Sequence, residues 1–177
     1  MHPLLTASVR RRMYKVMWFL ATGTLLLCLV FFVLSWLSHS SSNPAIGLQN
    51  GFLNECPQSP NCVCSDTTES NDSPAKLNPF LLKPEHYVLE WEDLLSAVLF
   101  AGGQIEIRTE DYLHATFRSK FFHFVDDLEL RKEGAVVHVR SASRVGHSDF
   151  GVNRKRVEMV RKHFENASLA RGKRLGR

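Results

Sequence analysis

Arginine and hydroxyl side chains are concentrated between residues 140 and 156, in a segment that also contains two glycines. Guanidinium groups and hydroxyls bind carboxylates and phosphates, and the first turn of a helix favours negative charge. The segment therefore fits a site for an anionic group. The candidate residues of that site are Ser143, Arg144, Gly146, Ser148 and Arg156. The same segment also fits a network of buried hydrogen bonds that fixes an irregular turn, and the sequence leaves both interpretations open.

Paired acids and serines are the other candidates for chemistry. Asp126 and Asp127 are adjacent on a predicted strand, so their side chains point to opposite faces and cannot act on one atom together. Ser141 and Ser143 lack the Gly-x-Ser-x-Gly turn that exposes the nucleophile of many hydrolases. We therefore expect no catalytic residue, no cofactor and no metal site. An envelope hydrolase remains as an alternative function.

Residues 17–37 form an apolar run without a charge, and a helix of this length spans about 30 Å, the hydrocarbon thickness of a bilayer. Trp18 and Trp36 lie at its two ends, where interfacial aromatic residues are common. We therefore predict a retained single-pass anchor rather than a cleaved signal peptide. Basic residues precede the run, so the positive-inside rule places residues 1–16 in the cytoplasm and the C-terminal part outside the cell membrane.

Three cysteines, at positions 56, 62 and 64, fall in the part of the chain that is expected to lie in an oxidising compartment. Cys56 and Cys62 close a short loop that contains two prolines, which favours a disulfide between them. The alternatives are a metal site, for which no fourth ligand is evident at suitable spacing, a nucleophile, and a free thiol.

The remaining sequence predicts a tether followed by an α+β domain. Residues 38–83 are rich in proline, serine and cysteine and are expected to be an extracytoplasmic tether. Residues 84–168 are expected to fold, and residues 169–177 form a basic tail. In the domain, a helix around residues 91–99 and a helix over residues 150–167 flank four strand-like runs. These runs are residues 104–108, 112–118, 121–131 and 135–141. We predict a four-stranded antiparallel meander with both helices on one face.

Register follows from placing hairpin loops at residues 119–120 and 133–134, which sets apolar residues opposite one another. This register puts Asp127 opposite Arg140 and predicts an ion pair between them. The sheet face away from the helices is unusually polar. It carries Tyr112, His114, Asp127, His138 and Arg140. We expect this face to be exposed for a ligand, or to be covered by a second layer such as the tether.

Four motifs together resemble one known family. They are Cys-Pro-x-Ser-Pro-Asn-Cys-Val from residue 56, Tyr-Leu-His-Ala from residue 112, Phe-Val-Asp-Asp-Leu-Glu from residue 124, and the segment 140–156. The chain resembles domain of unknown function family 1499 over roughly residues 53–165, and the resemblance implies no established activity. The residue after Val63 is usually serine in such motifs, whereas here it is Cys64, which leaves the pairing of the three cysteines ambiguous.

The net charge of +4 comes largely from basic residues at the two chain ends. A nucleic-acid-binding face would instead interleave basic and aromatic residues, so we expect no nucleic-acid partner. We predict a membrane-anchored extracytoplasmic binding or accessory module that recognises an anionic group of a lipid or of a membrane-protein partner. A structural subunit of a membrane complex is the third alternative.

Overall fold

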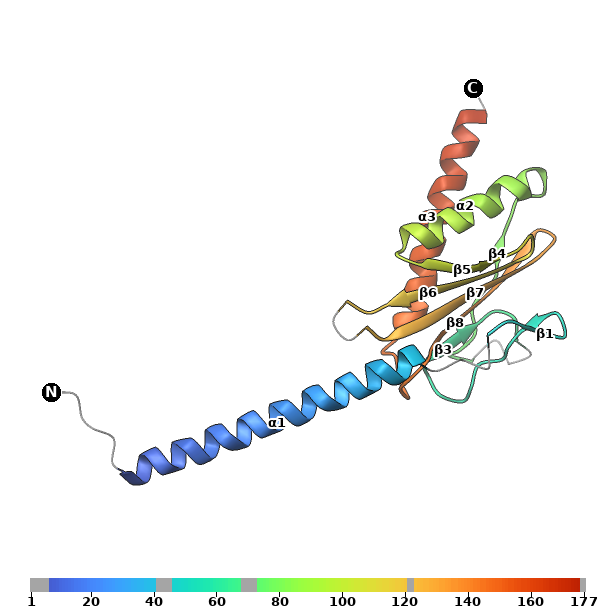
Figure 1. Ribbon diagram of the computed structural model, residues 1–177. Helices are drawn as coiled ribbons and strands as arrows, with labels where there is room; N and C mark the ends of the chain where they lie inside the picture. Colours follow the sequence, from blue (N-terminus) through green and yellow to red (C-terminus); the bar gives the residue numbers. More distant parts are fainter. Residues whose placement is uncertain (1–6, 41–45, 68–72, 121–122, 176–177) are drawn as a thin grey trace.

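A long apolar helix near the N-terminus projects away from the rest of the protein (Figure 1). The structure, a computed structural model, describes residues 7–40, 46–67, 73–120 and 123–175. The first of these ranges is helix α1 (Ala7–Ser40). Residues 8–36 of α1 are long and apolar enough to cross a membrane, and none of their most apolar window is buried inside the protein. By length and composition, α1 can therefore serve as the anchor that was predicted over residues 17–37.

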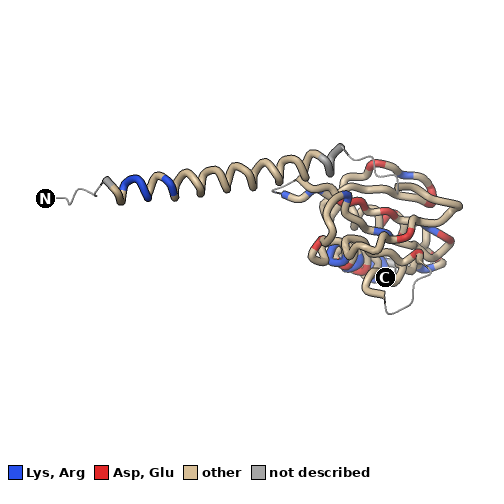
Figure 2. Tube along the Cα trace, turned by 90° about the horizontal axis from the view of Figure 1, so that it is seen from below, with Lys and Arg blue, Asp and Glu red and all other residues tan. Residues whose placement is uncertain are grey.

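Hydroxyl groups within α1 find their partners in the helix itself. The Oγ1 atoms of Thr22 and Thr24 each donate a hydrogen bond of 2.9 Å to the carbonyl four residues earlier. Inside a bilayer no water is present to satisfy such groups, so these internal bonds remove the cost of placing the hydroxyls there. The basic residues of α1 lie before its apolar part, near the N-terminal end of the helix (Figure 2).

Six antiparallel strands form the main sheet of the domain. They are β3 (Cys62–Cys64), β4 (Phe80–Leu81), β5 (Gln104–Arg108), β6 (Tyr112–Arg118), β7 (Val125–Glu133) and β8 (Val136–Ser143). The strand order is β3-β8-β7-β6-β5, and β4 pairs with another part of β8. A separate two-stranded hairpin consists of β1 (Leu48–Gln49) and β2 (Phe52–Leu53).

The predicted four-stranded meander therefore has too few strands, because the sheet has six. β3 and β4 both come from the segment that was expected to be a tether, and they extend the sheet beyond β8. Strands of two or three residues between prolines show no alternation of apolar and polar residues, so pattern analysis does not find them. Of this tether, residues 41–45 and 68–72 lie outside the described residues. The strand that was predicted to begin at residue 121 begins at Val125, and residues 121–122 are likewise not described.

Two helices cover one face of the sheet, as predicted. The short helix η1 (Pro84–His86) leads into α2 (Tyr87–Phe100), and α3 (Val152–Leu175) packs beside α2 (Figure 1). The main core consists of apolar residues from α2, α3 and the sheet. It includes Trp91, Leu94, Val98, Leu113, Leu128, Leu130, Val137, Val139, Val157, Val160 and Phe164. Each such side chain stabilises the fold by about 1.5–3 kcal/mol when fully buried.

The hairpin registers differ from the prediction. Phe117 on β6 lies opposite Asp126, and Leu130 on β7 lies opposite Val139 on β8. Each observed register differs from the predicted one by an even number of residues, so every side chain keeps its predicted face of the sheet. The cause lies in the loops. The N–H of Ser119 bonds to the carbonyl of Phe124 at 2.9 Å and closes a longer loop than predicted.

The predicted ion pair between Asp127 and Arg140 is consequently wrong. Asp127 lies opposite Ala142, and Arg140 lies opposite Glu129. The turn between β7 and β8 is displaced because Gly134 takes a φ of 59°, in the left-handed region that glycine adopts without steric cost. A shift of two residues preserves the faces of the sheet but changes the partner of every charged side chain.

Candidate functional site

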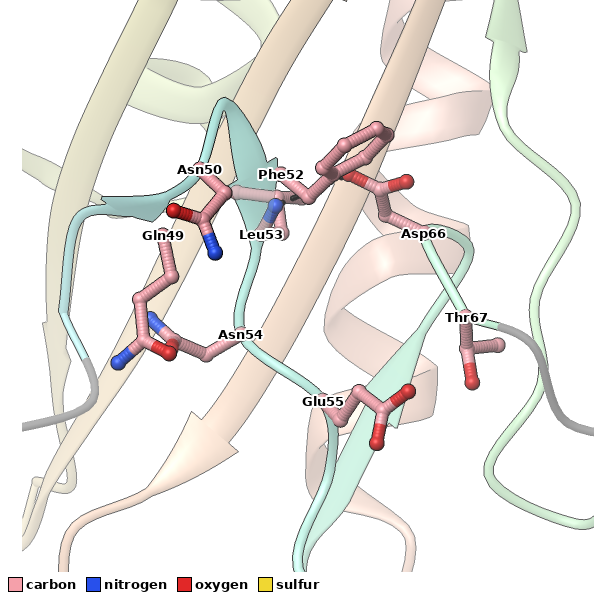
Figure 3. A pocket seen from close by; sticks show the side chains of 8 residues that line it. All are labelled: Gln49, Asn50, Phe52, Leu53, Asn54, Glu55, Asp66 and Thr67. Atoms are coloured by element: carbon pink, nitrogen blue, oxygen red, sulfur yellow. Dashed lines mark hydrogen bonds between the residues drawn. The ribbon is translucent and has the colours of Figure 1, made fainter.

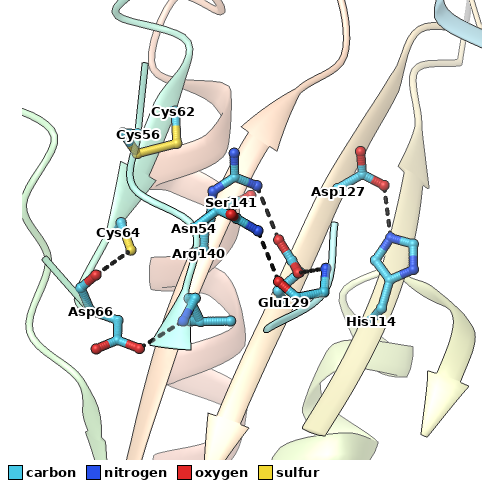
Figure 4. Close-up of polar contacts among 12 residues, drawn as sticks. Asn54, Cys56, Cys62, Cys64, Asp66, His114, Asp127, Glu129, Arg140 and Ser141 are labelled. Atoms are coloured by element: carbon cyan, nitrogen blue, oxygen red, sulfur yellow. Dashed lines mark hydrogen bonds and ion pairs between the residues drawn. A yellow bond between two sulfur atoms is a disulfide. The ribbon is translucent and has the colours of Figure 1, made fainter. Parts of the chain in front are cut away.

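The polar face of the sheet is an inner face, because residues 46–66 pass over it (Figures 1 and 4). Tyr112, His114 and Arg140 are 7%, 5% and 3% exposed, and Asp127 is fully buried. Leu53 and Cys64 pack with Tyr112 in a second, small apolar cluster. Of the two expectations for this face, cover by the tether is therefore the one that the structure shows.

Glu129, on β7, is the centre of the first polar cluster of this layer. Its Oε1 accepts hydrogen bonds from the Tyr112 hydroxyl at 2.7 Å and from the Gly47 N–H at 2.8 Å. Its Oε2 accepts a bond from Arg140 Nη1 at 3.0 Å (Figure 4). Burial, together with the negative charge of Glu129, raises the pKa of Tyr112 well above its ordinary value. This cluster fastens the chain that follows α1 to the middle of the sheet.

Asp127 is the centre of a second cluster, two residues along the same strand. His114 Nε2 lies 2.8 Å from Oδ1, and Arg144 donates two bonds of 2.9 Å from Nε and Nη2. Burial alone raises the pKa of Asp127, but the bonds from His114 and Arg144 outweigh it and lower the pKa to about 2. Asp127 is therefore ionised at neutral pH. His114 is engaged with a carboxylate rather than with a serine or cysteine nucleophile.

Asp66 and Arg131 form a third pair, which closes the other end of the layer. Arg131 Nε donates to Asp66 Oδ2 at 2.8 Å, and the N–H of Leu53 donates to the same oxygen at 3.0 Å. The pKa of Asp66 is lowered, because these bonds outweigh the opposing effect of burial. His138 lies nearby, with Nδ1 3.7 Å from Asp66 Oδ1. Two of the three clusters thus hold residues 46–66 against the sheet, through the bond from Gly47 to Glu129 and the pair of Asp66 with Arg131.

The segment 140–156 forms a hydrogen-bonded turn around Asn153, which is fully buried. The Oδ1 of Asn153 accepts a bond from Ser141 at 2.6 Å, and its Nδ2 donates to the carbonyl of Asn61 and to Ser143 Oγ, both at 3.0 Å. Asp149 begins α3 by accepting the N–H of Asn153 at 2.7 Å. Of the two interpretations of this segment, the network of buried hydrogen bonds describes most of its residues.

The five residues proposed for an anion site are not gathered around one cavity. Arg156 pairs with Asp126 and lies 4.6 Å from the centre of the Phe117 ring. The carbonyl of Gly146 accepts a 2.6 Å bond from Asn61, and Ser148 Oγ accepts the N–H of Phe150 at 3.3 Å. These three residues make contacts that stabilise the turn and its surroundings. Ser143 and Arg144, in contrast, line a pocket near the end of β8.

That pocket lies between the cysteine loop and the end of β8 and has a volume of about 400 Å³. It is lined by Glu55, Cys56, Pro57, Ser59, Asn61, Arg140, Ala142, Ser143 and Arg144. Only 3% of Arg140 is exposed, and its Nε has no hydrogen-bond partner among the described residues. In Figure 4 the Arg140 guanidinium lies between Glu129 and the Cys56–Cys62 disulfide. Sequence reasoning placed Arg140 on the polar face but did not connect it with Ser143 and Arg144.

A larger pocket of about 510 Å³ lies over the β1–β2 hairpin (Figure 3). Its lining is made of amide, apolar and acidic side chains, and its charged residues are Glu55 and Asp66. Asp66 is already committed to Arg131. Because this lining offers an anion no cationic partner, the smaller pocket beside Arg140 is the better candidate site.

The predicted disulfide between Cys56 and Cys62 is confirmed, with the two Cα atoms 5.6 Å apart. Cys64 is the remaining thiol of this group. It is 1% exposed, and its Sγ donates to the carbonyl of Asp66 at 3.5 Å. Burial raises the pKa of the Cys64 thiol to about 11. Since the thiolate is the reactive form, burial and the raised pKa both disfavour reaction at Cys64 in the folded protein.

Cys64 is therefore expected to resist alkylation in the native protein. A rise in pKa from 9.0 to about 11 lowers the thiolate fraction at neutral pH roughly 100-fold, and burial slows the reaction further. Full-length protein in mild detergent is treated with N-ethylmaleimide without reductant and mapped by mass spectrometry. Cys64 should be modified only after denaturation, whereas a cysteine introduced at the exposed Leu169 should react at once. A peptide that links Cys64 to Cys56 or to Cys62 would contradict this arrangement.

Fold and site together define a class of protein. It is an α+β domain with an apolar N-terminal helix, and its sheet is covered by helices on one face and by a buried layer of ion pairs and the segment 46–66 on the other. Residues 52–164 match the family described as "Protein of unknown function (DUF1499)". The chain belongs to this family, which confirms the resemblance carried by its motifs. No curated protein matches the chain, and no solved structure matches it either.

Proposed function

We propose that this protein is a membrane-anchored binding module that holds an anionic group of its ligand, a carboxylate or a phosphoryl oxygen, between Arg140 and Arg144. In this proposal α1 spans the cell membrane, residues 1–16 stay in the cytoplasm and residues 46–175 lie outside. The basic start of α1 supports this orientation. The Cys56–Cys62 disulfide supports it as well, because disulfides persist in oxidising compartments.

The observation that carries the binding proposal is that Arg140, whose buried Nε has no hydrogen-bond partner among the described residues, lines an open pocket. A buried N–H without a partner costs about 1–3 kcal/mol, and a ligand oxygen that accepts its hydrogen bond removes that cost. Arg144 lines the same pocket and bonds to Asp127 through Nε and Nη2, with no partner for Nη1 among the described residues. The two arginines thus offer N–H groups that can donate hydrogen bonds to one ligand in the same pocket.

Charge limits what this site can hold. Arg140 already faces Glu129 and Arg144 already faces Asp127, so the pocket has donors but little net positive charge. Glu55 adds a carboxylate at the rim. A group with one negative charge, such as a carboxylate or a phosphodiester, therefore fits better than a phosphate with two charges.

The hydrolase alternative receives no support from the described residues. Among them, no serine or cysteine side chain forms a hydrogen bond with a histidine, and His114 is engaged by Asp127. An activated nucleophile needs such a base within hydrogen-bond reach. Binding, rather than covalent chemistry, is what this arrangement of donors supports.

Binding is tested by isothermal titration of the full-length protein in mild detergent with dimethyl phosphate, acetate and inorganic phosphate. We expect saturable binding of the two singly charged probes with a dissociation constant near 1 mM, which corresponds to a binding free energy of about 4 kcal/mol. Inorganic phosphate should bind more weakly. Ala142→Val narrows the pocket without removing a polar partner and should weaken binding at least tenfold.

The matched control is Ala170→Val, the same substitution at an exposed position on α3, which should bind as the unmodified protein does. Thermal unfolding of both variants shows whether the fold is kept. The binding proposal is wrong if the unmodified protein shows no saturation up to about 50 mM probe, or if a folded Ala142→Val variant binds with unchanged affinity.

A further inference from the structure

One edge of the domain carries an unusually exposed aromatic side chain. Phe150 is 89% exposed, and its backbone φ of 54° lies in the left-handed region, which bulky residues adopt at a cost. The turn holds it there. The N–H of Phe150 bonds to Ser148 Oγ at 3.3 Å, and the N–H of the next residue, Gly151, bonds to Asp149 Oδ1 at 2.9 Å. A ring that is held outward in this way has an apolar surface available for contact.

This edge is the one next to the end of α1. Helix α1 contacts β7, and Figure 1 places the C-terminal part of α1 beside the edge at which β7 begins and β8 ends. Asp126 near the start of β7 lies opposite Ser143 at the end of β8. The N–H of Arg144 then bonds to the carbonyl of Val125 at 3.2 Å, so the loop that carries Phe150 leaves the sheet at that edge.

The chain after α1 is too short to let the domain move far from a bilayer that α1 crosses. The N–H of Gly47 is fixed to Glu129 on the sheet, and α1 ends at Ser40. About seven residues span at most about 25 Å when fully extended. The domain therefore stays close to the lipid head groups, with the edge beside α1 nearest to the end of the span.

Basic side chains lie at the same edge. Arg118 is the last residue of β6 and pairs with Val125, the first residue of β7. Arg118 and Lys120 are both exposed, and Figure 2 shows basic positions close to the end of α1. Lysine and arginine near an anionic bilayer surface contribute about 1 kcal/mol each, and an aromatic ring is favoured at the level of the head groups.

We propose that this membrane-facing edge, made of Arg118, Lys120 and Phe150, rests on the bilayer that α1 crosses. The Phe150 ring lies in the interfacial region, and the two basic side chains contact the phosphates of anionic lipids. The contact fixes the orientation of the domain relative to the membrane. It does not depend on ligand binding in the Arg140 pocket, although Ser143 and Arg144 of that pocket directly precede the same loop.

The test uses full-length protein in lipid nanodiscs with Cys28→Ser and a single added cysteine, labelled with the fluorophore bimane. The probe position is Phe150→Cys, and the matched control is Leu169→Cys, which is 63% exposed near the far end of α3 (Figure 1). A lipid with a nitroxide on its head group should quench bimane at position 150 several-fold more strongly than at position 169. Aqueous iodide should show the opposite order.

The lipid composition tests the basic part of the edge. Quenching at position 150 should rise when phosphatidylglycerol replaces part of the phosphatidylcholine, and Arg118→Glu with Lys120→Glu should abolish that rise. Equal quenching at positions 150 and 169 would overturn the proposal and would leave Phe150 as a contact for a protein partner. Quenching that does not respond to anionic lipid would overturn the assigned role of Arg118 and Lys120. Neither result bears on titrations of the Arg140 pocket with soluble anions.

Discussion

Glu129→Ala is expected to lower the free energy of unfolding by about 3–5 kcal/mol, the range for breaking a buried ion pair by removing one partner. Glu129 is fully buried and accepts hydrogen bonds from Tyr112, Arg140 and the backbone of Gly47. The variant leaves the Arg140 charge buried without its carboxylate, and it removes the hydrogen bond that holds Gly47 to the middle of the sheet. Since a domain is stable by only about 5–15 kcal/mol, this loss is a large share of the total.

The measurement is urea unfolding of full-length protein in mild detergent, followed by near-ultraviolet circular dichroism of the domain. Glu133→Ala is the matched control. It removes a carboxylate from the same strand that also pairs with an arginine, Arg131, but whose side chain is 66% exposed. An exposed pair of this kind contributes about 0–1 kcal/mol. Equal destabilisation by the two variants would show that the buried layer does not hold the domain together.

Asn153→Ala is expected to cost about 2–4 kcal/mol, because several buried groups lose their partner at once. Asn153 joins the end of β8, the cysteine loop and the first turn of α3 through its contacts with Ser141, Ser143 and the carbonyl of Asn61. The variant also removes an acceptor from Arg156. The turn between residues 144 and 151 should therefore loosen before the sheet does.

Val152→Ala is the control for this prediction, since it shortens the neighbouring side chain, which is 44% exposed, and leaves every hydrogen bond in place. Hydrogen exchange followed by mass spectrometry should show faster exchange over residues 141–153 in Asn153→Ala and unchanged exchange in β6. Protection equal to that of the unmodified protein would mean that the hydrogen bonds around Asn153 contribute little to the turn.

Local patterns in the sequence were sufficient for much of the fold. An uninterrupted apolar run predicts a long helix without tertiary information, and α1 has the required length and composition. The alternation of apolar residues along β6, β7 and β8 gives the correct faces, because a strand repeats every two residues. The short spacing of Cys56 and Cys62 favoured the disulfide that is present.

Pairing of polar side chains could not be predicted in the same way. Arg140 meets Glu129 rather than Asp127, because the register between β7 and β8 is shifted by two residues from the predicted one. Arg144 and Arg156 were candidates for binding an anion, whereas in the fold they pair with Asp127 and Asp126. Asn153, the centre of the turn, was not among the candidate site residues of the sequence.

The sequence by itself determined the apolar helix, the two faces of the central strands, the helices over one of them and the family. These features depend on composition and on repeats within a few residues. Only the tertiary structure decided that residues 46–66 cover the polar face and that Arg140 borders a pocket with Arg144. The contacts responsible join residues far apart in the chain, such as Gly47 with Glu129 at a separation of 82 and Asn61 with Gly146 at a separation of 85. Contacts at such separations depend on loop lengths and on the path of the whole chain, which local patterns do not specify.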